Sequence, residues 1–326
     1  MTKQETYVAG CRASGKLHIG NYLGQVKDLV ETQDRADLKR FYFIADLHAL
    51  TTDFNPKELR QNTLDVAASW LAAGVDPNKT VFFLQNEVLE HPWLAWIFNC
   101  GMPLGELERM TQYKDKSKQN ENNINAGLLT YPTLMAADIL LYKPTNIPVG
   151  EDQVQHVELA RFIARKFNNK FGKTFPEPKV YLQKPLRIMS LTDPTKKMSK
   201  TGDEALILDD EPKEIMRKLK KAVTATTAGG KSPGEENLML MLSHFGTKDE
   251  MAYFIDQQSS GQLKFSELKE TLAKDISEHF AEFREKKKEL LARPEQLAEI
   301  LGDGSRRARE VASETLKEVK EKVGFL

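Results

Sequence analysis

The first half of the chain alternates short apolar runs with longer amphipathic stretches. Apolar runs of strand length occupy residues 7–10, 41–45 and 80–85, and the last two are rich in aromatic and β-branched side chains. Helix-compatible stretches begin near His18 and at Asn55, where a proline at the first helical position precedes a pattern that continues to about residue 73. This order predicts an α/β domain in which helices cover both faces of a parallel sheet.

The pattern changes at about Leu206. Beyond this point amphipathic segments rich in lysine and glutamate predominate, and strand-like runs are no longer found. We therefore expect a Rossmann-like parallel-sheet domain over residues 1–190 and a helical domain over residues 191–304. A last helix, over about residues 305–326, is expected to pack back on the first domain.

Composition describes an ordinary globular protein. The 326 residues are 40% hydrophobic and 29% charged, with a mean hydropathy of −0.49. No apolar run reaches the roughly 18–20 residues of a membrane span, and the first residues lack a signal-peptide core, so we expect a cytoplasmic protein with no membrane association. The cysteines, Cys11 and Cys100, are far apart and have no metal-ligand spacing, which argues against zinc or an iron–sulfur cluster.

Net charge does not indicate a polyanionic partner. Lysine plus arginine equals aspartate plus glutamate at 47 each. Binding to a nucleic acid would therefore depend on local basic patches, of which residues 213–221 are one. Taken alone, such a run is more often a solvated helix face.

A glycine-containing loop over residues 10–21 joins the first strand to the first helix. In an open parallel sheet, ligands bind at the carboxyl ends of the strands, and a helix N-terminus there offers N–H groups to a phosphate. Three glycines would let a nucleotide approach the backbone, while Arg12, Ser14 and Lys16 could add donors. The loop has neither the GxGxxG pattern nor the ending of a P-loop, and on the glycines alone an ordinary turn is equally consistent.

A second loop, residues 193–203, contains three lysines: Lys196, Lys197 and Lys200. Clustered ammonium groups on a loop suit a leaving pyrophosphate, whose developing charge they meet when the loop closes. For the lysines in isolation, a solvated basic loop is the favoured interpretation.

Residues 127–142 form an apolar helix pattern with one carboxylate. The helical spacing places Tyr131, Met135, Asp138 and Tyr142 on one face. Burying Asp138 is costly unless a donor meets it; an indole N–H is such a donor, and Met135 suits an aromatic ring. From the pattern alone, a core-facing stripe with Asp138 capping or ion-paired elsewhere is favoured.

The two loops together change this interpretation. HIGN at 18–21 and KMSKT at 197–201 resemble the HIGH and KMSKS signatures of class I aminoacyl-tRNA synthetases, each departing at its last position. Four further segments resemble the bacterial tryptophanyl-tRNA synthetase family, nearly from end to end of the chain: residues 105–112, 127–142, 148–156 and 308–313. The resemblance implies a catalytic α/β domain and an anticodon-binding helical domain. It also implies ATP with Mg²⁺, L-tryptophan and tRNA(Trp) as substrates, and a homodimer.

The resemblance also implies which residues form the site. For tryptophan these are Val8, Gly10, His48, Tyr131, Met135, Asp138, Ile139 and Gln153, with Asp138 recognising the indole. For ATP they are Arg12, Ala13, Ser14, Gly20, Asn21, Gly150, Asp152, Gln153, Ile188, Lys197, Met198, Ser199 and Lys200. His18 and Asn21 would stabilise the reacting phosphate, and Lys116, Lys197 and Lys200 the departing pyrophosphate; no protein metal ligand is implied.

Some of these positions have ordinary alternatives. His48 is equally consistent with a buried, hydrogen-bonded histidine, and Lys116 with an exposed lysine. Arg12 and Ala13 stand where many bacterial members of the family have glutamine and proline, which adds a fixed charge near the α-phosphate.

The implied reaction is attack of the tryptophan carboxylate on the α-phosphate of ATP, followed by transfer to the 2′-hydroxyl of the tRNA terminus. The carboxylate is already a nucleophile, so positioning and charge stabilisation suffice. Tyrosyl-tRNA synthetase is the nearest alternative, but residues 134–138 offer an apolar slot with one acceptor rather than partners for a phenol. A tryptophan-binding paralogue that charges no tRNA, or a smaller nucleotidyltransferase of the superfamily, fits the second loop and the long helical region less well.

Overall fold

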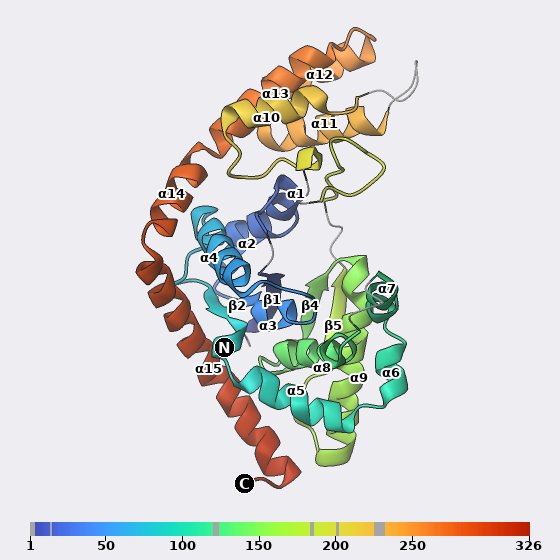
Figure 1. Ribbon diagram of the computed structural model, residues 1–326, viewed down its shortest axis with the longest axis vertical. Helices are drawn as coiled ribbons and strands as arrows, with labels where there is room; N and C mark the ends of the chain where they lie inside the picture. The colour runs from blue at the N-terminus through green and yellow to red at the C-terminus, as the bar shows by residue number, and fades with distance from the viewer. Residues whose placement is uncertain (1–3, 14, 120–123, 183–185, 200–201, 225–231) are drawn as a thin grey trace.

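The computed structural model describes residues 4–326 except 14, 120–123, 183–185, 200–201 and 225–231. The side chains of Gln119, Pro148 and Asp152 are likewise outside the description. Figure 1 shows an elongated molecule with strands at its centre, a group of helices at each end, and a long C-terminal helix along one side.

Parallel strands form the centre of the fold. Strands β1 (Glu5–Arg12), β2 (Leu38–Ala45) and β3 (Val81–Leu84) pair in the order β1-β2-β3, while β4 (Asn146–Val149) pairs with β5 (Lys179–Leu182). The parallel α/β architecture predicted from the sequence is confirmed, although the described strands are hydrogen-bonded as two groups rather than one. The register sets Gly10 of β1 opposite Phe43 of β2.

Helices cover both faces of these strands. The first helical run consists of α1 (Ile19–Asn21), the π-helical η1 (Tyr22–Val26) and α2 (Lys27–Thr32). Helix α4 (Pro56–Ala72) begins as predicted, since the Asn55 side chain accepts a hydrogen bond from the Lys57 N–H at 3.0 Å. The remaining elements of this half are α3 (Asp46–Ala49), η2 (Gln85–Glu87), α5 (Glu90–Gly101), α6 (Leu104–Glu108), α7 (Thr111–Gln119), α8 (Ala126–Leu140), η3 (Glu151–Gln153) and α9 (Val154–Phe171).

Strand β2 separates two hydrophobic cores. Because successive strand side chains point to opposite faces, Tyr42 and Ile44 pack in one core with Trp70 of α4. Phe41 and Phe43 pack in the other core with side chains of α5, α8 and α9. The first core continues into α10, α11, α13 and the start of α15, whereas the second joins the α5–α9 end of the molecule to the later part of α15.

Beyond residue 201, the regular elements that the structure describes are helices. After η4 (Gly202–Glu204) come α10 (Pro212–Lys221), α11 (Pro233–Phe245), α12 (Lys248–Ser259) and α13 (Phe265–His279), grouped at one end in Figure 1. Helices α14 (Ala281–Leu291) and α15 (Pro294–Val323) then return along the α/β domain. Helix α15 packs on β3, where Arg307 donates a hydrogen bond of 2.6 Å to the Pro77 carbonyl.

Candidate active site

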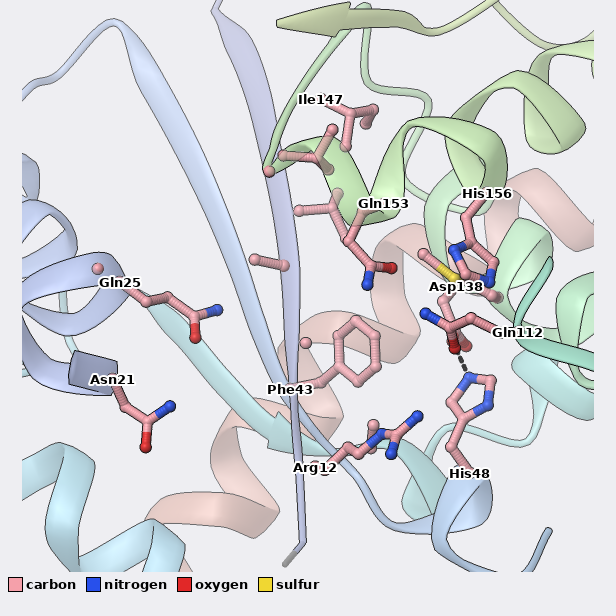
Figure 2. A pocket seen from close by; sticks show the side chains of 18 of the residues that line it. Arg12, Asn21, Gln25, Phe43, His48, Gln112, Asp138, Ile147, Gln153 and His156 are labelled. Carbon is pink, nitrogen blue, oxygen red and sulfur yellow. Dashed lines mark hydrogen bonds and ion pairs between the residues drawn. The ribbon is translucent and has the colours of Figure 1, made fainter. Parts of the chain in front are cut away.

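A cavity of about 640 Å³ lies at the carboxyl ends of β1 and β2. Its walls come from the first helical run, from α3, and from α7, α8 and α9. Figure 2 shows Asn21 and Gln25 on one side of β1 and His48 and Asp138 on the other, with Phe43 between them. The cavity therefore has two ends, one at the first signature and one at α8, the helix that carries Asp138.

Backbone pairing brings the two signature regions together. The Ile19 N–H donates to the Leu206 carbonyl at 2.9 Å, and the Leu208 N–H donates to the Leu17 carbonyl at 3.0 Å. Residues that follow the second loop thus lie beside the first loop. Two segments that are about 180 residues apart in sequence meet at one edge of the cavity because of this pairing.

His18 and Asn21 cap the first helical run reciprocally. The His18 Nδ1 accepts a hydrogen bond from the Asn21 N–H, and the Asn21 Oδ1 accepts one from the His18 N–H, both at 3.3 Å. This arrangement places the proton of a neutral His18 ring on Nε2. Gly20 leaves room for the ring, since a Cβ there would lie 3.0 Å from it and 3.7 Å from Ile188.

The second loop is attached at its base to the helical domain. Met189 forms a β-bridge with Lys197, and the Asn237 side chain of α11 makes two hydrogen bonds to the Met189 backbone, at 2.8 and 2.9 Å. The Ser199 hydroxyl donates to the Glu204 carboxylate. Helix α11 therefore fixes the start of the segment that contains the signature lysines.

Asp138 is a buried carboxylate with three donors around it. Its Oδ1 accepts from Gln85 Nε2 at 2.8 Å and from His91 Nδ1 at 2.6 Å, and its Oδ2 accepts from Gln85 Nε2 and His48 Nε2, both at 2.9 Å. Burial opposes ionisation, but the hydrogen bonds from His48 and His91 outweigh it and lower the pKa of Asp138 to about 2. The group is therefore ionised at neutral pH, although only 2% of it is exposed.

Three cationic side chains line the cavity, and two of them, Arg12 and Lys116, lie near Tyr131. The third is Lys197. Burial, together with the charge of Arg12, lowers the pKa of Lys116, as expected for neighbouring cations with no anion between them. The Lys116 Nζ also lies 5.7 Å from the centre of the Tyr131 ring. This arrangement favours an anionic ligand.

Tyr131 completes the wall between the two ends. Its hydroxyl lies 2.9 Å from His156 Nε2, and burial raises the pKa of the phenol to about 12. The group thus remains a neutral hydroxyl that can position a ligand but does not act as a base.

Most of the residues predicted from the sequence line this one cavity. They are Val8, Gly10, Arg12, His18, Gly20, Asn21, His48, Lys116, Tyr131, Met135, Asp138, Ile139, Gly150, Gln153, Lys197 and Met198. Ala13 and Ile188 are buried in the core beneath it, and Ser199 is bonded to Glu204 instead. Ser14, Lys200 and the Asp152 side chain lie outside the described residues.

Several residues at the cavity were not predicted from the sequence. Gln25, Phe43, Gln112 and His156 line the cavity, and Gln85 reaches Asp138 from behind it. Gln25 lies four residues after Asn21, so helical spacing could have identified it. Gln85 is a polar residue at the end of a buried strand, which is also a recognisable signal. The sequence contains no such signal for Phe43, because the position of this side chain depends on the register between β1 and β2.

Neither a metal cluster nor a membrane helix emerges from the described part of the chain. Its histidine, cysteine, aspartate and glutamate side chains form no group of three suited to a metal ion. Its helices, likewise, are all too short or too polar to cross a bilayer.

The fold and cavity belong to a known class of enzymes. Residues 2–292 match the family described as tRNA synthetases class I (W and Y), so the chain belongs to this family. A tryptophan–tRNA ligase of Caldanaerobacter subterraneus subsp. tengcongensis is 46% identical over 330 residues, which cover 98% of each chain. One from Wolinella succinogenes is 40% identical over the whole of both chains.

A solved structure agrees with these matches. Tryptophanyl-tRNA synthetase from Campylobacter jejuni, complexed with ADP and tryptophan, superimposes with a TM-score of 0.88 at 37% identity, covering 98% of this chain and 99% of that one. Within the family, the chain therefore stands with the tryptophan–tRNA ligases. The enzyme class predicted from the sequence motifs is confirmed.

Proposed function

We propose that the chain activates L-tryptophan with ATP and transfers it to tRNA(Trp). The observation that carries this proposal is a buried, ionised Asp138 in a cavity that Arg12, Lys116 and Lys197 also line. An indole N–H can only donate and a triphosphate can only accept, so the buried acceptor and the cationic side chains match the two substrates in opposite senses. The reaction between them needs no general base, because the substrate carboxylate is itself the nucleophile.

The indole would enter by replacing one existing hydrogen bond. A carboxylate offers about four acceptor positions, and the donors Gln85, His91 and His48 already occupy them. The His48 side chain is 13% exposed, whereas that of His91 is fully buried. We therefore assign His48 as the donor that gives way to the indole N–H, with Met135 and Phe43 forming the apolar walls.

At the other end, the first helical run and Arg12 would hold the reacting phosphate. His18 and Asn21 would stabilise it, and Lys116, Lys197 and Lys200 would hold the departing pyrophosphate. Mg²⁺ would arrive on the phosphates of ATP and neutralise part of their charge.

The tRNA would contact the helical domain. Within residues 213–221, Arg217 and Lys221 form ion pairs with Asp203, and Lys218 is buried in a 2.7 Å pair with Asp210. Only part of the predicted basic stretch is therefore available to phosphates: Lys213 and Lys220 are exposed, and Lys221 is exposed but paired with Asp203. We propose residues 1–190 as the catalytic domain, with α15 returning to it, and residues 191–304 as the domain that carries the second loop and binds the anticodon.

We also propose that the protein is a homodimer in the cytoplasm. Three large apolar side chains in the region of α5 and α6 are exposed: Leu89, just before α5, by 59%, Trp96, within α5, by 66%, and Leu104, at the start of α6, by 58%. Such a group is typical of an interface between subunits, and we assign it to a second copy of this chain.

The test is ATP–pyrophosphate exchange with tryptophan and with tyrosine, followed by charging of tRNA(Trp). Exchange should depend on tryptophan and fall by about tenfold or more in Asp138→Asn, which loses the ionised acceptor. Asp34→Asn is the matched control, because Asp34 is exposed, pairs with Lys79 and is not among the residues that line the cavity. Faster exchange with tyrosine would refute the substrate assignment, and tryptophan binding without charging of any tRNA would favour a regulatory paralogue.

A further inference from the structure

Behind Asp138, away from the cavity, two polar side chains form a chain of hydrogen bonds. His91 Nδ1 lies 2.6 Å from Asp138 Oδ1, and its Nε2 lies 2.8 Å from the Tyr142 hydroxyl. His91 is fully buried and Tyr142 is 3% exposed. Neither lines the cavity, so neither touches a bound substrate.

The donors and acceptors of this chain can be assigned. Asp138 is ionised and only accepts, so His91 Nδ1 bears a proton. In the part of the chain that the structure describes, the buried Tyr142 hydroxyl has no acceptor other than His91 Nε2. Its proton therefore points to Nε2, which must be unprotonated, and the ring is a neutral Nδ1–H tautomer. The phenol stays protonated, because burial and the nearby charge of Asp138 raise its pKa well above the ordinary value.

This chain fixes the orientation of the carboxylate. Gln85 bridges both oxygens of Asp138, and His91 adds a bond to Oδ1 alone. Oδ2 is then the oxygen that faces His48 and the cavity. Without the bond from His91, the carboxylate could turn about its terminal torsion, which is broad for aspartate.

We propose that His91 is a positioning residue for tryptophan recognition, held by Tyr142 in the one tautomer that keeps Asp138 ionised and its Oδ2 directed into the cavity. The inference rests on the proposed function of Asp138 as the indole acceptor. It explains how His48 can leave its hydrogen bond to Asp138 without disturbing the carboxylate.

Two isosteric substitutions separate positioning from packing. In His91→Asn the amide nitrogen can occupy the place of Nδ1 and keep the donor to Asp138, whereas in His91→Gln the amide reaches the place of Nε2 and that donor is lost. In tryptophan-dependent exchange, we expect the KM for tryptophan to rise about tenfold or more in His91→Gln and to stay within about threefold of native in His91→Asn. The KM for ATP should change little in either, because the ATP end of the cavity is separate.

The pH profile gives a second readout. Loss of the His91 donor raises the pKa of Asp138, so in His91→Gln the acid limb at which tryptophan affinity is lost should move to higher pH, while His91→Asn retains the native profile. Equal KM values for tryptophan in the two variants, or a native pH profile in His91→Gln, would overturn the proposal and leave His91 with a packing role.

The unmodified protein provides a test that does not depend on how the variants fold. Nitrogen NMR of histidine-labelled protein should show one ring that is neutral and protonated on Nδ1 alone. A spectrum in which no ring is protonated on Nδ1 alone would overturn the proposal. If the native chain shows no tryptophan-dependent exchange, the proposed function fails instead, and the NMR result separates the two failures.

Discussion

Helix α15 approaches the sheet most closely at Gly304, where one added methyl group should have a large effect. A Cβ at this position would lie 2.7 Å from the carbonyl carbon of Phe82 in β3, and closer still to its oxygen. Real contacts of Cβ atoms are essentially never shorter than 3.0 Å. The obstacle is backbone rather than a flexible side chain, so in Gly304→Ala either the helix or the strand must shift.

The magnitude follows from two opposing terms. Overpacking of a well-packed site costs about 1–3 kcal/mol, and a clash with backbone belongs at the upper end. Replacing glycine by alanine inside a helix returns about 1 kcal/mol. We expect a net loss of about 2 kcal/mol, which in a chain of this size lowers Tm by roughly 3–6 °C.

Gly302→Ala is the matched control, because it lies in the same helix with nothing within 4 Å of the added Cβ. It should raise stability by about 0.5–1 kcal/mol through helix propensity alone. Thermal unfolding followed by circular dichroism compares the two variants directly, and their difference isolates the steric term. If Gly304→Ala unfolds at or above the temperature of Gly302→Ala, the close packing of α15 on β3 is wrong. Because β3 leads into Gln85, Gly304→Ala should also raise the KM for tryptophan, and Gly302→Ala should not.

Three further predictions concern the cavity. The pKa of Asp138 falls to about 2 in the fold, so its ionised form contributes stability above the ordinary carboxyl pKa and loses that contribution as the pH falls toward 2. The free energy of unfolding of Asp138→Asn should be lower than that of the native protein by about 2 kcal/mol at neutral pH, and this difference should disappear between about pH 4 and pH 2. A difference that stays constant in acid unfolding would contradict this. Asn237→Ala removes both hydrogen bonds to Met189. The kcat for exchange should therefore fall about tenfold, with the KM for tryptophan nearly unchanged. A change in that KM alone would argue against a role of Asn237 in positioning the second loop. Gly10→Ala brings a Cβ to 2.6 Å from the Phe43 ring. Displacement of that ring should raise the KM values of tryptophan and ATP by about tenfold. Native KM values would show that the ring is not part of the site.

The elements that could be predicted from the sequence are those with local signals. The cap and proline at the start of α4, and the continuous apolar run of β2, are written in a few adjacent residues. Helix α8 was also predictable, because its apolar face repeats within one element. What the local pattern could not supply was the surroundings of Asp138, since Gln85 and His91 are 53 and 47 residues away from it in sequence.

Charge was the least informative signal. Residues 213–221 form a basic run in the sequence, yet in the fold Arg217, Lys218 and Lys221 are paired with Asp203 or Asp210. A sequence shows that charges are present but does not show which carboxylates the fold brings to them. Lysines in a run can therefore serve to anchor a loop, here the one that follows the second signature, as readily as to bind a polyanion.

The two cores suggest why the two ends of the cavity can work as separate parts. Residues of the first loop, including Leu17 and Ile19, belong to the core that continues into the helical domain. Asn237 and the backbone of Leu206 connect both signature regions to that domain. The indole end belongs to the other core, with Ile139. Both signature segments are thus packed in one core, which also includes Tyr42 and Trp70 of the α/β domain, and the helix that carries Asp138 is packed in the other. Substitutions at the base of the second loop should accordingly act on ATP and pyrophosphate, and substitutions behind Asp138 on tryptophan, because each group of residues is packed in a different core.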